Sequence, residues 1–109
     1  MAKYPVVVYG ASGYTGMLIM DWLIDQQIPF TAVARNAKRA QEMMAQRVVR
    51  LESATYEVVE TEHSVEALTR VFQGAKVVCN TVGPFVNFGL TTVEAALKAG
   101  CHHIDTTGE

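Results

Sequence analysis

The segment from Val6 to Met17 constrains this 109-residue chain more than any other part of it. It reads VVVYGASGYTGM: a β-branched run, then three glycines spaced three residues apart, then an apolar helical pattern that continues to Ile24. β-Branched runs favour strands, and glycine adopts the backbone conformations that tight turns require. The segment therefore predicts a strand, a tight turn and a helix in direct succession, which is how a parallel sheet with crossover helices begins.

Each of the three glycines has a separate expected role. Gly10 permits a sharp turn at the strand end, where φ is expected to be positive. Gly13 has no Cβ, so a phosphate group can approach the backbone, and Gly16 lets the helix lie close to the sheet. The helix start is expected to offer unpaired amides from about Gly13 to Thr15, and Ser12 and Thr15 add hydroxyl donors. These features together predict a binding site for the pyrophosphate of a dinucleotide.

The spacing of the glycines leaves a second interpretation open. It is G-x-x-G-x-x-G, whereas the strict dinucleotide fingerprint is G-x-G-x-x-G. Under the alternative interpretation, the segment is a tight turn that binds no ligand. The position of the glycines, at a strand end that opens a helix, favours the pyrophosphate site.

The rest of the chain alternates strand and helix patterns. Further strands are expected over residues 30–34, 56–60, 76–81 and 102–106, and further helices after Asn36, after Ser64 and around 90–99. Asn36 and Ser64 are good N-cap residues, and Val93, Ala96 and Leu97 are expected to face inward on the last helix.

This alternation predicts the fold class. We expect an α/β fold with a doubly wound parallel sheet, five strands in the order 3-2-1-4-5, and helices on both faces. The strand at 76–81 has a nearly continuous apolar pattern, which is typical of an inner strand buried on both faces, whereas 56–60 suits an edge. A ligand crevice is expected between the carboxyl ends of strands one and four.

Composition and charge narrow the possible partners and the location of the protein. The chain is 50% hydrophobic and 18% charged, with a net charge of −2, so nothing indicates a nucleic-acid or anionic membrane partner. No apolar run is long enough to span a membrane. Cys79 and Cys101 have neither C-x-x-C nor metal-ligand spacing, which predicts two free thiols, no metal site and a cytoplasmic location.

The chain stops directly after the fifth predicted strand, at Gly108 and Glu109. A dinucleotide domain usually continues, and a dehydrogenase needs a substrate domain. We therefore expect residues 1–109 to be one dinucleotide-binding domain, the N-terminal fragment of a longer chain. The alternative is a natural single-domain protein.

The residues after the second predicted strand bear on the choice of cofactor. NAD-specific domains place an Asp or Glu at this point, where it accepts a hydrogen bond from the ribose 2′-hydroxyl. Here the chain reads Arg35-Asn36, followed by Lys38 and Arg39. A guanidinium pairs with a 2′-phosphate in a forked geometry, which favours NADP(H) over NAD(H). Alternatively, these cations are only a solvated helix start.

Three segments together resemble the saccharopine dehydrogenase-like oxidoreductases, a family that includes saccharopine reductases and trans-acting enoyl reductases. They are the glycine motif, TVGPFVNFG at 81–89 and AGCHHIDTTGE at 99–109. The resemblance is to the N-terminal cofactor domain only. It implies that residues of the glycine turn hold the pyrophosphate. It also implies that Arg35 lies at the adenosine ribose and that residues 81–84 lie beside the nicotinamide ribose. The full set of candidate cofactor-binding residues is Gly10, Ser12, Gly13, Tyr14, Thr15, Gly16, Arg35, Asn36, Lys38, Thr81, Val82, Gly83 and Pro84.

The segment GASGYTG also resembles the start of N-acetyl-glutamyl-phosphate reductases and of some extended short-chain dehydrogenases. The first group needs a reactive thiol, but Cys101 precedes a strand on the side away from the crevice and lacks a pattern that lowers its pKa. The second group needs a Tyr-x-x-x-Lys pair, which this sequence lacks.

The last strand carries further polar residues. His102 and His103 begin that strand, away from the crevice, and are not expected to be catalytic. For Asp105 and Glu109, a role in the site and a role in capping a turn both stay open. Catalytic residues are not identified.

These observations predict the cofactor domain of an NADP(H)-dependent oxidoreductase. Its small-molecule substrate would bind through a domain outside this chain, so the fragment alone is expected to bind cofactor weakly and to catalyse nothing. The alternative is a Rossmann module that senses NADP(H) and contacts a partner protein without catalysis. Nothing in the sequence predicts the oligomeric state.

Overall fold

The structure is a computed structural model that describes residues 1–82 and 85–105, with only the course of the backbone described for 85–88. Its elements, in chain order, are β1 (Val6–Tyr9), α1 (Tyr14–Asp25), β2 (Phe30–Ala34), α2 (Ala37–Arg47), the short 3-10 helix η1 (Leu51–Ser53), β3 (Tyr56–Glu60), α3 (Val65–Phe72), β4 (Val77–Asn80), α4 (Phe85–Ala99) and β5 (His102–Asp105).

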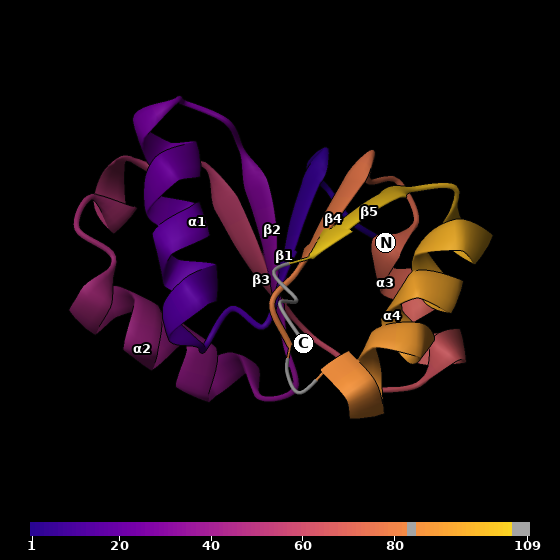
Figure 1. Cartoon of the computed structure of the whole chain (residues 1–109). Coiled ribbons are helices and arrows are strands. Elements are labelled where there is room, and N and C mark those ends of the chain that lie inside the picture. The colour runs from indigo at the N-terminus through magenta and orange to yellow at the C-terminus, as the bar shows by residue number, and fades with distance from the viewer. Residues whose placement is uncertain (83–84, 106–109) are drawn as a thin grey trace.

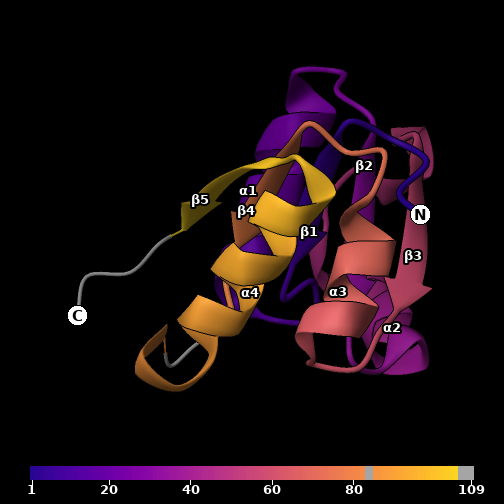
Figure 2. The same ribbon diagram turned by 90° about the vertical axis from the view of Figure 1, so that its right-hand side faces the viewer.

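The five strands form one parallel sheet in the order β3-β2-β1-β4-β5, which confirms the predicted fold class and strand order. Helices α1 and α2 cover one face, and α3 and α4 cover the other (Figure 1). Figure 2 shows β3 and β5 at opposite edges, with α3 and α4 side by side over the sheet. Because the strands are parallel, their carboxyl ends meet at one edge of the sheet, next to the glycine turn.

Strand β1 lies at the centre of two apolar cores. Val7 and Tyr9 face the core beneath α3 and α4, while Val8 faces the core beneath α1 and α2. All three side chains are at most 1% exposed. A strand buried on both faces needs apolar residues at consecutive positions, which explains why the β-branched run is continuous rather than alternating.

The two predicted N-caps are confirmed. The Asn36 side chain accepts a hydrogen bond from the Arg39 amide at 3.0 Å, and Ser64 accepts one from the Ala67 amide at 3.1 Å. Each cap satisfies one of the amides that a helix start leaves without a helical partner. The caps therefore fix where α2 and α3 begin, directly beyond the ends of β2 and β3.

The last helix differs from the prediction. It begins at Phe85 rather than near Leu90, because the loop pattern of the preceding residues conceals its first turn. Leu97, expected to face inward, is 71% exposed, and the fully buried positions among residues 89–99 of this helix are Thr92, Ala95 and Ala96. Small side chains let α4 pack closely on α3, and their low hydrophobicity hides this face from a search for large apolar residues. The last strand ends at Asp105, and Thr106 lies outside the described residues.

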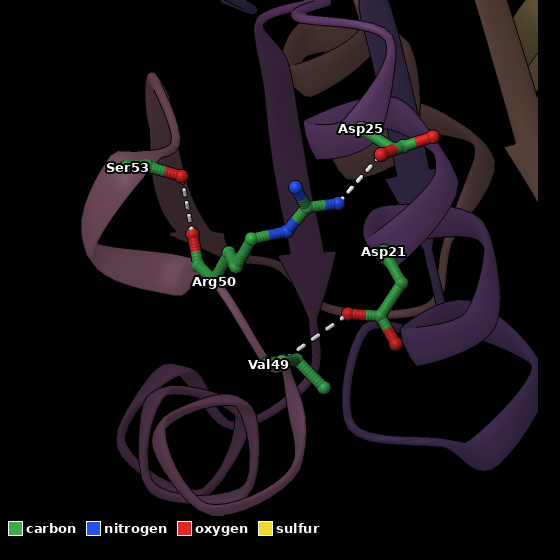
Figure 3. Close-up of polar contacts among 5 residues, drawn as sticks. All are labelled: Asp21, Asp25, Val49, Arg50 and Ser53. Atoms are coloured by element: carbon green, nitrogen blue, oxygen red, sulfur yellow. Dashed lines mark hydrogen bonds and ion pairs between the residues drawn. The ribbon is translucent and has the colours of Figure 1, made fainter.

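At the end of the sheet opposite the glycine turn, polar contacts join the connection between α2 and β3 to the end of α1 (Figure 3). Arg50 Nη2 lies 2.6 Å from Asp25 Oδ1, and the Val49 amide donates to Asp21 Oδ1 at 3.3 Å. Ser53 Oγ donates to the Arg50 carbonyl at 2.8 Å. These contacts lie near the amino ends of β2 and β3, so they are structural ties remote from the glycine turn.

Candidate cofactor-binding site

A cavity of about 340 Å³ opens where β1, β2 and β4 end. Its lining consists of residues that follow or end these strands: Tyr9, Gly10, Ser12, Gly13, Ala34, Arg35, Asn36, Arg39, Thr81 and Val82. The lining includes the ends of strands one and four, where the crevice was expected, and extends along the end of strand two.

Backbone hydrogen bonds give the glycine turn its shape. Gly10 has φ +95°, as predicted, and its amide donates to the Val33 carbonyl at 3.0 Å. The Gly13 amide donates to the Gly10 carbonyl at 3.0 Å, so the expectation that this amide is unpaired was wrong. The first helical hydrogen bond runs from Met17 to Gly13, at 3.1 Å. The amides from Tyr14 to Gly16 precede it, and they lie at the positive end of the α1 dipole.

Two of the glycines are required by the packing of the protein itself. A Cβ on Gly10 would lie 2.4 Å from Thr81 Oγ1, and one on Gly16 would lie 2.5 Å from the Gly10 carbonyl oxygen. Thr81 is fixed there because its hydroxyl donates to the Tyr9 carbonyl at 2.7 Å. The prediction that Gly16 permits close packing of the helix is therefore confirmed.

Gly13 is different from the other two glycines. The nearest atom to a Cβ at this position would be the Gly10 carbonyl oxygen, at 3.4 Å. Its φ is −91°, which any residue adopts. Neither the packing of the chain nor its backbone conformation therefore requires a glycine at this exposed position.

Two arginines and the start of α2 form the other side of the cavity. Arg35 follows β2 directly, and Arg39 lies in the first turn of α2, where its amide binds the Asn36 cap. The Ala37 amide donates to Glu60 Oε1 at 3.0 Å, so the helix start is satisfied by two acceptors. Because of this capping, the helix can begin despite the cations in its first turn, which oppose the helix dipole.

The structure places the predicted site residues in three groups. Gly10, Ser12, Gly13, Arg35, Asn36, Thr81 and Val82 come together in the cavity lining. Tyr14, Thr15 and Gly16 form the first turn of α1, and Lys38 is exposed on α2 outside the lining. Gly83 and Pro84 lie outside the described residues.

Three of the lining residues, Tyr9, Ala34 and Arg39, were not predicted as site residues from the sequence. Tyr9 and Ala34 each precede a selected residue directly, as the last residue of a strand that ends at the cavity. Arg39 lies three residues after the N-cap Asn36, in the first turn of α2, and this spacing from the cap was the available signal for it.

Cys79, Cys101 and Asp105 do not line this cavity. Cys101 is buried, and its thiol donates to the carbonyls of Phe72 and Ala75. Burial raises the pKa of both the Cys101 and the Cys79 thiols, which disfavours the reactive thiolate. Asp105 ends β5 with its carboxylate 3.9 Å from His103 Nδ1, and Glu109 lies outside the described residues.

Two further kinds of feature are absent from the described part of the chain. No group of three or more His, Cys, Asp or Glu side chains is placed to hold a metal ion there. None of its helices combines the length and the apolar character that crossing a membrane requires.

Residues 6–108 match the family model of the saccharopine dehydrogenase NADP binding domain. The chain is 32% identical over its whole length to a lipid droplet localized protein of Caenorhabditis elegans, of which it covers 27%. It is 33% identical to a trans-acting enoyl reductase of Mycobacterium ulcerans, with 98% of this chain and 26% of the relative covered. A saccharopine dehydrogenase-like oxidoreductase of Mus musculus is 29% identical, with 97% of this chain and 28% of the relative covered. The chain thus spans about a quarter of the length of these relatives.

Solved structures with low sequence identity share the fold. An NADPH-dependent quinone oxidoreductase of Escherichia coli, complexed with NADPH, matches with a TM-score of 0.65 at 24% identity, over 88% of this chain and 34% of that chain. Yeast methylglyoxal/isovaleraldehyde reductase, complexed with NADPH, matches with a TM-score of 0.65 at 23% identity, over 86% and 32%.

Proposed function

This chain belongs to the saccharopine dehydrogenase NADP-binding domain family, and from that premise we propose that it is the cofactor domain of a longer NADP(H)-dependent oxidoreductase. The observation that carries the proposal is the single cavity in which the glycine turn, the start of α1 and two arginines converge. A dinucleotide needs these same elements: donors for its pyrophosphate and cations for an added phosphate.

The pyrophosphate is proposed to lie against the turn between β1 and α1. Gly13 leaves room for a phosphate where the packing of the chain requires no glycine. The amides of Tyr14 and Thr15 and the Ser12 hydroxyl supply donors, and α1 has no acidic residue in its first turn. A phosphate there would be stabilised by the positive end of the helix dipole.

The adenosine 2′-phosphate is proposed to lie between Arg35 and Arg39. Arg35 occupies the position after β2 where an NAD-specific domain carries a carboxylate. A carboxylate would repel the 2′-phosphate, whereas guanidinium groups bind it through paired hydrogen bonds. Asn36 lines the cavity beside Arg35, whereas Lys38, which the sequence also predicts as a cofactor contact, lies outside the lining.

Thr81 and Val82 are proposed to lie beside the nicotinamide ribose, with Gly83 and Pro84 following them in the sequence. The cofactor supplies the hydride, and the residues of this chain bind and orient it. The groups that bind a small-molecule substrate and move protons are proposed to lie outside this chain, in a longer protein. Membership of an oxidoreductase family favours this function over a sensing module. The cytoplasmic location stays a prediction, supported by two buried free cysteines.

Calorimetric titration with NADPH and NADH tests the proposal on the wild type and on Arg35→Asp. We expect the wild type to prefer NADPH and Arg35→Asp to lose that preference, because it places a carboxylate where the 2′-phosphate binds. Arg47→Asp is the matched control, since Arg47 lies at the far end of α2, outside the cavity lining. Equal affinity of the wild type for both cofactors would remove Arg35 from the site, and binding of neither would overturn the proposed site.

A further inference from the structure

The side chains of Tyr9 and His63 meet although Tyr9 belongs to β1 and His63 follows β3, and these strands are not neighbours in the sheet. Tyr9 ends β1, and its hydroxyl lies 2.6 Å from Nδ1 of His63, in the loop between β3 and α3. The two rings are stacked, with centroids 5.9 Å apart and an interplanar angle of 11°. Phe72 of α3 contacts the Tyr9 ring edge-on, with centroids 6.0 Å apart. The loop is therefore joined across β2 to the strand that carries the glycine turn.

The tyrosine in this hydrogen bond is buried. Tyr9 is 1% exposed. Burial raises the pKa of Tyr9 to about 12, against a smaller opposing effect of the Arg35 charge. The Tyr9 hydroxyl therefore keeps its proton in the folded chain and shares a hydrogen bond with His63 Nδ1.

A second contact holds the same loop to the end of β2. The Thr61 amide donates to the Ala34 carbonyl at 3.0 Å, and Ala34 directly precedes Arg35. The loop is thus attached at Ala34 and at Tyr9, and both of these residues line the cavity. Ser64, which follows His63, caps α3, so the position of the helix depends on the same loop.

We propose that the Tyr9–His63 contact positions the wall of the cavity at its adenosine half, so that Tyr9, Ala34 and Arg35 keep the spacing that an adenosine 2′,5′-bisphosphate group requires. This inference rests on the proposed function. Neither side chain needs to touch the ligand: both are positioning residues that act through the backbone of β1 and of the loop.

Removal of one hydroxyl tests this inference. Tyr9→Phe keeps the ring and its packing but removes the hydrogen bond to His63. Tyr56→Phe is the matched control, because the Tyr56 hydroxyl accepts from Gln41 Nε2 at 2.9 Å and its ring stacks on Phe30, outside the cavity. The probe is adenosine 2′,5′-bisphosphate, titrated by calorimetry well below the melting temperature of each variant.

We expect Tyr9→Phe to bind the probe about threefold to tenfold more weakly, the range that the loss of one hydrogen bond covers. Tyr56→Phe should bind it as the wild type does. At His63, substitution by Asn places an amide oxygen near the position of Nδ1, so His63→Asn should bind the probe more tightly than His63→Ala. The comparison of His63→Asn with His63→Ala also tests the inference in the case that Tyr9→Phe does not fold.

Two results would overturn the inference, and they are distinguishable. A Tyr9→Phe protein with a lower melting temperature but wild-type affinity for the probe would show that the contact only stabilises the fold. Equal affinities of His63→Asn and His63→Ala would show the same. If the wild type itself binds neither NADPH nor the probe, the proposed function fails first, and the inference fails with it.

Discussion

The carbonyl oxygen of Gly10 lies 2.5 Å from the position that a Cβ on Gly16 would take. Real side chains do not come this close to backbone atoms, so Gly16→Ala requires α1 to move away from the turn. Alanine normally stabilises a helix relative to glycine by about 1 kcal/mol. Here we expect the opposite sign, a loss of about 1–3 kcal/mol in the free energy of unfolding, measured by urea denaturation.

Gly13→Ala is the matched control for that substitution. A Cβ on Gly13 would meet its nearest neighbour at 3.4 Å, so we expect stability to change by no more than about 0.5 kcal/mol. If Gly13 serves the pyrophosphate, the same variant should bind NADPH more weakly than the wild type. A stable Gly13→Ala protein with unchanged affinity would contradict the proposed position of the phosphate.

Arg39 and Lys38 are neighbouring cations on α2, but only Arg39 lines the cavity. We expect Arg39→Gln to weaken NADPH binding several-fold more than Lys38→Gln, because charge-assisted hydrogen bonds to a phosphate require direct contact. Titrations at two salt concentrations provide a second reading: loss of a phosphate contact should make the affinity less sensitive to salt. A larger effect of Lys38→Gln would place the 2′-phosphate elsewhere.

The buried hydroxyl of Tyr9 predicts a loss of stability at high pH. Burial raises the pKa of Tyr9 from its ordinary value of 10.0 to about 12 in the folded chain. The contribution is therefore fully present below pH 10, declines as the pH rises from 10 to 12, and amounts to about 3 kcal/mol. Urea denaturation across this range should show a steeper decline for the wild type than for Tyr9→Phe.

Both thiols also have raised pKa values and add to the alkaline decline. They are common to the wild type and to Tyr9→Phe, so the difference between these two proteins isolates the tyrosine. Parallel curves for the wild type and Tyr9→Phe would show that the Tyr9 hydroxyl titrates in the folded chain as it does in the unfolded chain.

The ion pair between Asp25 and Arg50 is expected to contribute little, despite its distance of 2.6 Å. Both side chains are more than half exposed, at 55% and 57%, and exposed pairs are typically worth about 0–1 kcal/mol. Asp25→Asn should therefore lower the free energy of unfolding by less than about 1 kcal/mol. The decrease should shrink further in high salt, whereas a larger loss that salt does not change would indicate a packing role for this carboxyl.

The sheet could be predicted because each of its strands has a local signal. The nearly continuous apolar strand pattern of 76–81, with Val77, Val78 and Cys79 in succession, indicated an inner strand. Asn36 and Ser64 marked the starts of two helices by their capping chemistry. The last helix was predicted less well, since over residues 89–99, whose side chains the structure describes, the fully buried positions are Thr92, Ala95 and Ala96. Small residues of this kind are recognisable only once the close approach of α3 is known.

The candidate site could be predicted only in part. The glycine turn and Arg35 follow from local rules, because each adjoins the end of a strand. The Tyr9–His63 contact could not be predicted, since it joins residues 54 positions apart through a loop whose path the sequence does not indicate. The hydrogen bond of the Gly13 amide also depends on the exact course of the turn, which no spacing of glycines specifies.

The bond between the Thr81 hydroxyl and the Tyr9 carbonyl spans 72 positions of the chain, and it has a consequence for the order of folding. β1 and β2 can pair soon after both have been synthesised, but β4 joins β1 only when the chain up to residue 81 is available. Contacts this distant in sequence form late, because the entropy of closing the loop must be overcome first. We therefore expect the glycine turn to acquire its final shape among the last steps of folding, so that the proposed binding of cofactor would report on completion of the sheet rather than on the turn alone.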